Sequence, residues 1–93
     1  MGLYRWDLSK NDKLIRERKV SFEEVLLAIE QWHLLDAIEN PNQRRYKDQR
    51  AFVVEIGGYI HLVPFVERGE EIFLKTIIPS RKLTRRYLRT EEG

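Results

Sequence analysis

Three strand-like runs in the second half of the chain, separated by short turns that contain glycine, constrain the fold most strongly. The first turn is Gly57-Gly58, a dipeptide that permits the positive φ angles of a tight hairpin. The second turn covers residues 67–70 and contains Gly69. The runs between them cover residues 50–56, 59–66 and 72–78. Strands joined in this way form an antiparallel meander, to which residues 33–38 can add a first strand.

Helical patterns precede and follow these runs. Residues 10–19 are mostly good helix formers with a short apolar stripe. Ser21 and Glu24 have the spacing of a capping box, in which each side chain bonds to the other residue's backbone N–H, and a second helix should follow to about residue 31. A last helix is expected over residues 81–89, because Leu83 and Tyr87 lie one turn apart on a single face.

Helical runs that are segregated from strand runs indicate an α+β fold. We expect two N-terminal helices, a small antiparallel sheet of three to four strands and a C-terminal helix, with the helices packed on one face of the sheet. The chain has 93 residues, and two separate cores of half that length would each be too small to be stable. A single domain over residues 1–93 is therefore expected.

Cysteine and histidine usage limits the chemistry. The chain contains no cysteine, which excludes disulfides, thiolate catalysis and cysteine-based metal sites. His33 and His61 are far apart and have no local carboxylate motif, so we expect no metal and no other cofactor. No apolar run approaches the roughly 18 residues of a membrane helix. We expect a cytoplasmic protein that does not contact a membrane.

Basic residues are concentrated in two segments. Residues 41–50 carry four bases and one acid, and residues 75–89 carry six bases and no acid, whereas the rest of the chain has twice as many acids as bases. Two basic segments in an otherwise acidic chain favour a surface that binds phosphates. The alternative is a solvated basic surface without a ligand.

Two ordered blocks of residues resemble the BrnT family of ribonuclease toxins. The first block comprises Tyr4, Trp6-Asp7, Lys10-Asn11 and residues 20–25, and the second comprises Glu67-Arg68-Gly69, residues 77–82 and residues 84–87. The resemblance implies a fold similar to the RelE-type ribonucleases. It also implies a ribbon-helix-helix antitoxin partner of the BrnA type, which blocks the toxin and represses the shared promoter, so that DNA would be contacted only through the antitoxin.

One segment departs from the family pattern. Where the family usually has Lys-His-Gly, this chain has Glu17, Arg18 and Lys19. Loss of the glycine predicts a helix end of different construction, since glycine is the favoured left-handed cap. Loss of the histidine removes the side chain that titrates near neutrality. This loss favours an alternative function, a catalytically inactive module that binds an antitoxin or nucleic acid. A plain RNA- or DNA-binding domain is a third hypothesis.

Cleavage of RNA by its own 2′-hydroxyl needs a base, positive charge on the phosphorane and an acid for the leaving oxygen, and it needs no metal or protein nucleophile. We expect a cationic cluster that binds the phosphate and stabilises its charge, formed by Arg50, Arg68, Lys75 and Arg81. The expected proton-transfer groups are Glu67, Lys75 and Tyr87. Further RNA contacts are expected from Arg44, Arg45, Tyr46, Lys82, Arg85 and Arg86. The endoribonuclease hypothesis requires the four cations of the cluster to converge in one pocket.

Overall fold

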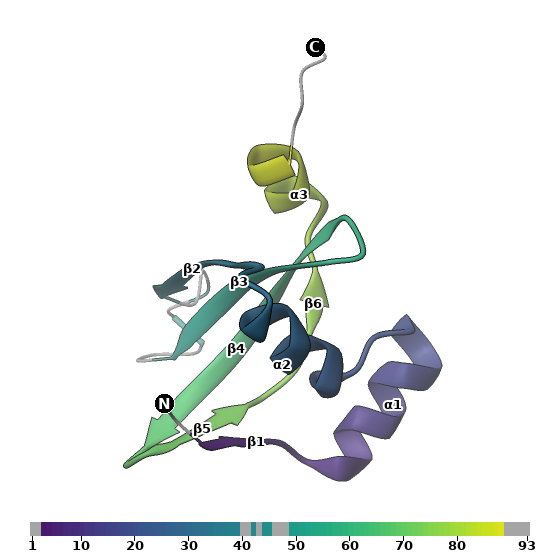
Figure 1. Ribbon diagram of the computed structural model, residues 1–93. Coiled ribbons are helices and arrows are strands. Elements are labelled where there is room, and N and C mark those ends of the chain that lie inside the picture. The colour runs from purple at the N-terminus through teal and green to yellow at the C-terminus, as the bar shows by residue number, and fades with distance from the viewer. Residues whose placement is uncertain (1–2, 40–41, 43, 46–48, 89–93) are drawn as a thin grey trace.

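The computed structural model describes residues 3–39, 42, 44–45 and 49–88, and Figure 1 shows their arrangement. The fold class is α+β, as the sequence predicts. The elements in chain order are β1 (Leu3–Arg5), α1 (Leu8–Arg18), α2 (Phe22–Glu30), β2 (Leu34–Glu39), β3 (Arg50–Ile56), β4 (Tyr59–Arg68), β5 (Glu71–Leu74), β6 (Ile78–Pro79) and α3 (Arg81–Leu88). The predicted end of the last helix at residue 89 lies outside the described residues.

The sheet is mixed and larger than the sequence predicts. Its strand order is β1-β5-β4-β3-β2, and β6 pairs with β4. The β2–β3–β4–β5 pairs are antiparallel, but β1 pairs with β5 in parallel, with Leu3 opposite Glu71. The expectation of a purely antiparallel sheet of three to four strands is therefore wrong. β1 has three residues, too few to show an alternating pattern, and its partner strand lies at the other end of the chain.

Among the described residues no helix is long and apolar enough to cross a membrane.

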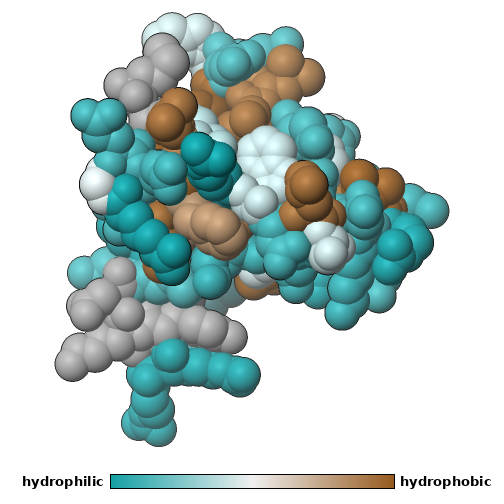
Figure 2. Space-filling model, turned by 90° about the horizontal axis from the view of Figure 1, so that it is seen from below, coloured by the Kyte–Doolittle hydropathy of each residue, from teal (hydrophilic) through white to brown (hydrophobic). Residues whose placement is uncertain are grey.

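The view from below, the side on which β1 and β5 lie in Figure 1, shows apolar side chains interrupted by hydrophilic ones (Figure 2). Single exposed apolar side chains of this kind are normal on protein surfaces, whereas a large continuous apolar patch would mark a contact surface.

The main core lies between the sheet and helices α1 and α2. Alternation along the strands directs Phe52, Val63, Phe65 and Leu74 to the same face, where the rings of Phe52 and Phe65 stack with centroids 4.0 Å apart. Phe22 on α2 is fully buried in this core. We call this side of the sheet the inner face and the opposite side the outer face.

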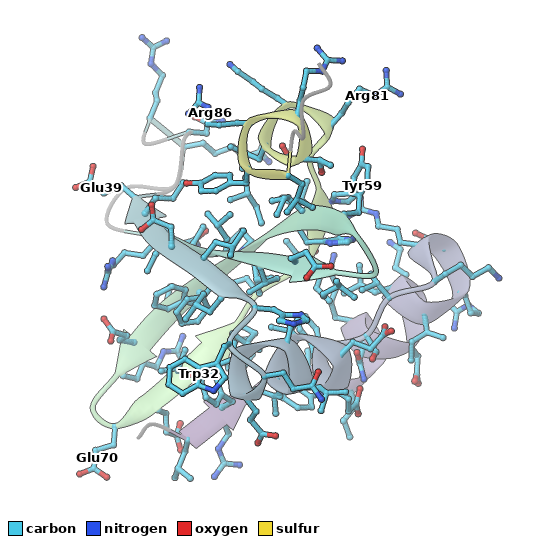
Figure 3. All side chains as sticks on the ribbon, turned by 45° about the horizontal axis from the view of Figure 1, so that its top comes forward. Trp32, Glu39, Tyr59, Glu70, Arg81 and Arg86 are labelled. Atoms are coloured by element: carbon cyan, nitrogen blue, oxygen red, sulfur yellow. The ribbon has the colours of Figure 1, made fainter. Side chains whose placement is uncertain are left out.

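Helix α3 packs on the outer face, so the expectation that all helices share one face is wrong. Figure 3 shows the sheet between α3 and α2. The strands are apolar on both faces: Ala51, Val53 and Ile60 are also fully buried, although they belong to the outer face. An apolar face that is exposed to water is unfavourable. The apolar side of α3 packs against the outer face at β4 and buries part of it.

The predicted single strand over residues 72–78 is interrupted between β5 and β6. Phe65 pairs with Leu74 and Leu62 pairs with Ile78, so three steps along β4 correspond to four steps along the other strand. One extra residue of this kind is a β-bulge. Within the interrupted segment Ile77 is fully buried, and its carbonyl accepts a hydrogen bond of 2.6 Å from Nη1 of Arg18.

A buried asparagine joins α1 to the start of α2. The Asn11 side chain is 5% exposed. Its Oδ1 accepts from the backbone N–H of Phe22 and its Nδ2 donates to Oε1 of Glu23, both at 2.8 Å. The hydrogen bond from Asn11 is the main cause that lowers the pKa of Glu23 below its ordinary value. The same turn contains the predicted capping box of Ser21 and Glu24, which is confirmed with both of its hydrogen bonds.

Lys19 ends α1 in the left-handed conformation that glycine favours, with φ +59° and its N–H donating to the Ile15 carbonyl. The expectation of a helix end of different construction is wrong, because lysine here adopts the glycine geometry.

A non-glycine residue in the left-handed region is strained by roughly 1 kcal/mol. Lys19→Gly should therefore raise the free energy of unfolding by about 1 kcal/mol, measured by urea denaturation. The control, Lys13→Gly in the helix interior, should lower it by about the same amount, and a loss at both positions would contradict the strain at Lys19.

Candidate functional site

Phe73 lies on the outer face between two cationic side chains. It pairs with Val66 across β4 and β5 and is half-buried. Cζ of Arg68 lies 5.8 Å from the centre of its ring, and Nζ of Lys75 lies 5.3 Å from it. Among the described residues neither cation forms an ion pair within 4 Å. We call Arg68, Phe73 and Lys75 the outer-face cluster.

Local backbone geometry positions the three side chains. Arg68 is the last residue of β4 rather than a turn residue, because the turn consists of Gly69, with φ +60°, and Glu70. The backbone N–H of Lys75 donates to the carbonyl of Pro64 at 2.8 Å, which keeps Lys75 beside β4 just before the bulge. The hairpin β4–β5 thus brings together residues 68 and 75, which the sequence separates by a turn.

The carboxylate of Glu71, which lies on the same face as the cluster, is paired with a cation of its own. Glu71 pairs with Arg68 across the hairpin, and its Oε2 lies 3.1 Å from Nε of Arg5 on β1. Arg5 in turn pairs with Phe73 in the parallel register, so it lies on the same face. The outer face therefore carries Arg5, Arg68 and Lys75 together with Glu71 around a partly exposed aromatic ring, and the excess of cations on this face attracts anions.

Two predicted site residues lie on the inner face. Arg50 pairs with Phe65, and its Cζ lies 5.8 Å from the centre of that ring. Glu67 pairs with Ile72, which packs against the main core. Alternating residues of a strand point to opposite faces, so Glu67 cannot share a site with its neighbour Arg68. The structure therefore does not bring Arg50 and Glu67 into the outer-face cluster.

Arg81 lies far from Arg68. His61 pairs with Pro79, just before α3, whereas Arg68 lies seven positions away along β4, roughly 23 Å at the rise of a strand. In Figure 3, Arg81 and Arg86 point away from different sides of α3. The single pocket of four cations that the sequence predicts is not formed: the structure unites Arg68 with Lys75 only.

Helix α3 presents two cationic flanks. Arg81 and Arg85 are one turn apart on one flank, and Lys82 and Arg86 are one turn apart on the other. Lys82 and Arg86 line a groove of about 290 Å³ between α3 and the outer face, the α3 groove, whose remaining lining residues are Ile38, Leu62, Ser80 and Leu83. Tyr87 spans from α3 to β2, where its hydroxyl lies 3.4 Å from Oδ2 of Asp36.

The first basic segment, residues 41–50, is described only in part. Arg44 and Arg45 are exposed in a turn after β2, and the predicted stacking residue Tyr46 lies outside the described residues.

The two histidines have structural partners. Nδ1 of His33 lies 3.0 Å from Oε1 of Glu55. His61 is 9% exposed, and burial lowers its pKa below the ordinary value. Within the described ranges no three histidine or acidic side chains gather in a way that could hold a metal ion.

Sequence reasoning missed Phe73 and Arg5. For Phe73 a signal was present, because it lies two residues before Lys75 in a strand-like run and must share its face. For Arg5 there was none, since β1 was not predicted. Comparison of the chain with protein-family models gives no match, and comparison with curated proteins gives none either.

Proposed function

We propose that this protein binds single-stranded RNA at the outer-face cluster and cleaves it there by attack of the 2′-hydroxyl on the adjacent phosphate, with Arg68 and Lys75 taking the place of the four-cation pocket, which is not formed. The observation that carries the proposal is the Phe73 ring with the cationic groups of Arg68 and Lys75 over it. A base that stacks on the ring would displace one of these groups toward the phosphate of the same nucleotide. An aromatic ring stacks on an unpaired base, worth roughly 1–3 kcal/mol per base, and flanking cations hold the phosphates on either side. A duplex keeps its bases stacked on one another and cannot use such a ring.

The two cations suit different parts of the reaction. The planar guanidinium of Arg68 can hold two phosphate oxygens at once, which fixes the strand. Lys75 is a compact charge, suited to the oxygen on which negative charge develops as the 2′-oxygen attacks. The 2′-hydroxyl loses its proton to water as its oxygen bonds to phosphorus, the bond to the 5′-oxygen breaks, and that oxygen takes a proton from water. The products are a 2′,3′-cyclic phosphate and a 5′-hydroxyl. This chemistry takes its nucleophile from the substrate.

The resemblance to BrnT toxins supports the biological part of the proposal. The protein would act on messenger RNA in the cytoplasm and would be neutralised by a ribbon-helix-helix antitoxin of the BrnA type. Contact with DNA would be made through that antitoxin.

A second candidate function is a module that binds RNA or an antitoxin without catalysis. It is favoured by the positions of the predicted proton-transfer groups. Glu67 lies on the inner face, and the hydroxyl of Tyr87 is engaged by Asp36. Of the three groups, only Lys75 belongs to the outer-face cluster. A cluster that stacks a base and holds phosphates but lacks an acid–base pair would bind RNA and leave it intact.

Phe73→Ala should weaken RNA binding by roughly tenfold, because it removes one stacking contact. Binding is measured by fluorescence anisotropy with a labelled 2′-O-methyl oligonucleotide, which lacks the attacking hydroxyl. Phe73→Trp preserves the ring and should retain affinity, and Lys13→Ala on α1 serves as a surface control. Circular dichroism checks the fold of each variant. Equal affinity of Phe73→Ala and the parent protein would contradict the proposed site. Gel analysis of an unmodified RNA in the presence of a chelator then separates the cleaving enzyme from the non-catalytic module.

A further inference from the structure

The α3 groove differs from the outer-face cluster in its chemistry. Its floor is apolar, formed by Ile38, Leu62 and Leu83, and cations stand on one rim, Lys82 and Arg86. A free phosphate would gain nothing from an apolar floor. A flat heterocycle would bury its faces there, while the phosphate attached to it would remain at the cationic rim.

We infer that the α3 groove holds a second nucleobase of the same RNA strand that stacks on Phe73. This inference rests on the proposed function and adds to it a second subsite with its own lining. The groove would accept an unpaired base only, because a paired base presents its faces to its neighbours in the helix.

The two subsites lie in line on one face of the sheet. Residues 62, 64, 66 and 68 of β4 alternate onto the outer face. Phe73 lies beside Val66, and Lys75 is bonded to Pro64. Leu62 belongs to the groove. The order along the strand is therefore aromatic ring, lysine, groove, which matches a base, the intervening backbone phosphates and a second base.

The spacing sets the length of RNA that reaches both subsites. Leu62 is four positions along β4 from Val66, roughly 13 Å at the rise of a strand. A stacked strand advances about 3.4 Å per nucleotide, so two bases that far apart belong to nucleotides that are not adjacent. An oligonucleotide of five residues spans the distance even when stacked, whereas a dinucleotide occupies one subsite only.

Hydrogen bonds to β4 fix the helix that forms the groove wall. The N–H of Ser80 donates to the carbonyl of Ile60 at 2.9 Å. The N–H of Ile60 donates to the hydroxyl of Thr84 at 2.8 Å. Because α3 is bonded to the fully buried Ile60 through both groups, its distance from the sheet is set by the fold. The groove is therefore ready for a ligand without rearrangement.

The test measures the affinity of 2′-O-methyl oligonucleotides of two to six residues by fluorescence anisotropy. The parent protein should bind the pentamer roughly tenfold more tightly than the dimer, because a second base is buried. In the double variant Lys82→Ala with Arg86→Ala this gain should fall to about twofold. The charge-matched comparison, Arg81→Ala with Arg85→Ala, changes the other flank of the same helix and should retain most of the gain.

The outcomes separate the inference from the proposed function. A gain with length that is equally reduced in both double variants would overturn the groove as a subsite and indicate attraction by general charge. Affinity that is independent of length but lost in Phe73→Ala would overturn the groove and leave the proposed function intact. Absence of binding to every oligonucleotide would overturn both. Ile38→Trp, which places a large side chain in the groove from an edge strand, should abolish the gain in affinity with length.

Discussion

Lys75→Ala should lower the rate of RNA cleavage by about 10²- to 10³-fold, the usual effect of removing one positioned group that stabilises developing charge. The Lys75 side chain is exposed, and its anchoring bond to Pro64 is made by the backbone, which alanine preserves. The fold should therefore remain. The rate is measured under single-turnover conditions with saturating protein and excess chelator, so that weaker binding does not enter the result.

A conservative variant distinguishes the roles open to Lys75. Lys75→Arg keeps the positive charge, but arginine does not lose its proton in proteins. Retention of most of the rate would assign Lys75 to charge stabilisation, and a loss as deep as that of alanine would assign it to proton transfer. Cleavage by Lys75→Ala at the parent rate would place the chemistry elsewhere. A parent protein that binds RNA in the anisotropy assay but does not cleave it would support the non-catalytic module.

Asn11→Leu should lower the free energy of unfolding by about 3 kcal/mol. The substitution removes the acceptor of the Phe22 N–H, which is buried, and leaves that donor without a partner. A buried unsatisfied donor costs roughly 1–3 kcal/mol, and the bond to Glu23 is lost as well. The measurement is urea denaturation at neutral pH, and a loss below 1 kcal/mol would show that α1 and α2 are joined mainly by apolar packing.

Two further measurements isolate the contributions of Asn11. Glu23→Gln keeps an acceptor for Nδ2 of Asn11 and should cost well under 1 kcal/mol, because Glu23 is exposed. In the parent protein the pKa of Glu23 is lowered by Asn11. The stability from this carboxylate is therefore present above its ordinary pKa and is lost as the pH falls through the lowered value. Asn11→Leu should show a weaker dependence on pH in that acidic range.

Elements that depend on neighbouring residues could be predicted from the sequence. The capping box of Ser21 and Glu24 is formed as its spacing predicts, and the Gly57-Gly58 turn joins β3 and β4 with both glycines at positive φ. These features are local: a side chain bonds to a backbone group three residues away, or a backbone angle selects the residue that tolerates it. The order of helices and strands, and with it the α+β class, follows from the same local signals.

The composition of the candidate site could not be predicted in the same way. The sequence supplies the cations but does not show which of them meet. Arg50 and Arg68 lie on opposite faces of the sheet. Arg81 is separated from Arg68 by most of the length of β4. Phe73 was not predicted as a site residue, although its ring is contacted by both Arg68 and Lys75.

The sequence by itself determined the order of the three helices and of the strands β2 to β5, the capping box, the Gly57-Gly58 turn and how much positive charge the last third of the chain carries. Only the tertiary structure decided that α3 covers the outer face, that β1 completes the sheet beside β5, and that Arg68 and Lys75 share one ring. The physical reason is how far apart along the chain the interacting residues lie. Caps and turns are fixed by interactions within a few residues, whereas strand register and the choice of face are fixed by burying apolar side chains contributed from distant parts of the chain.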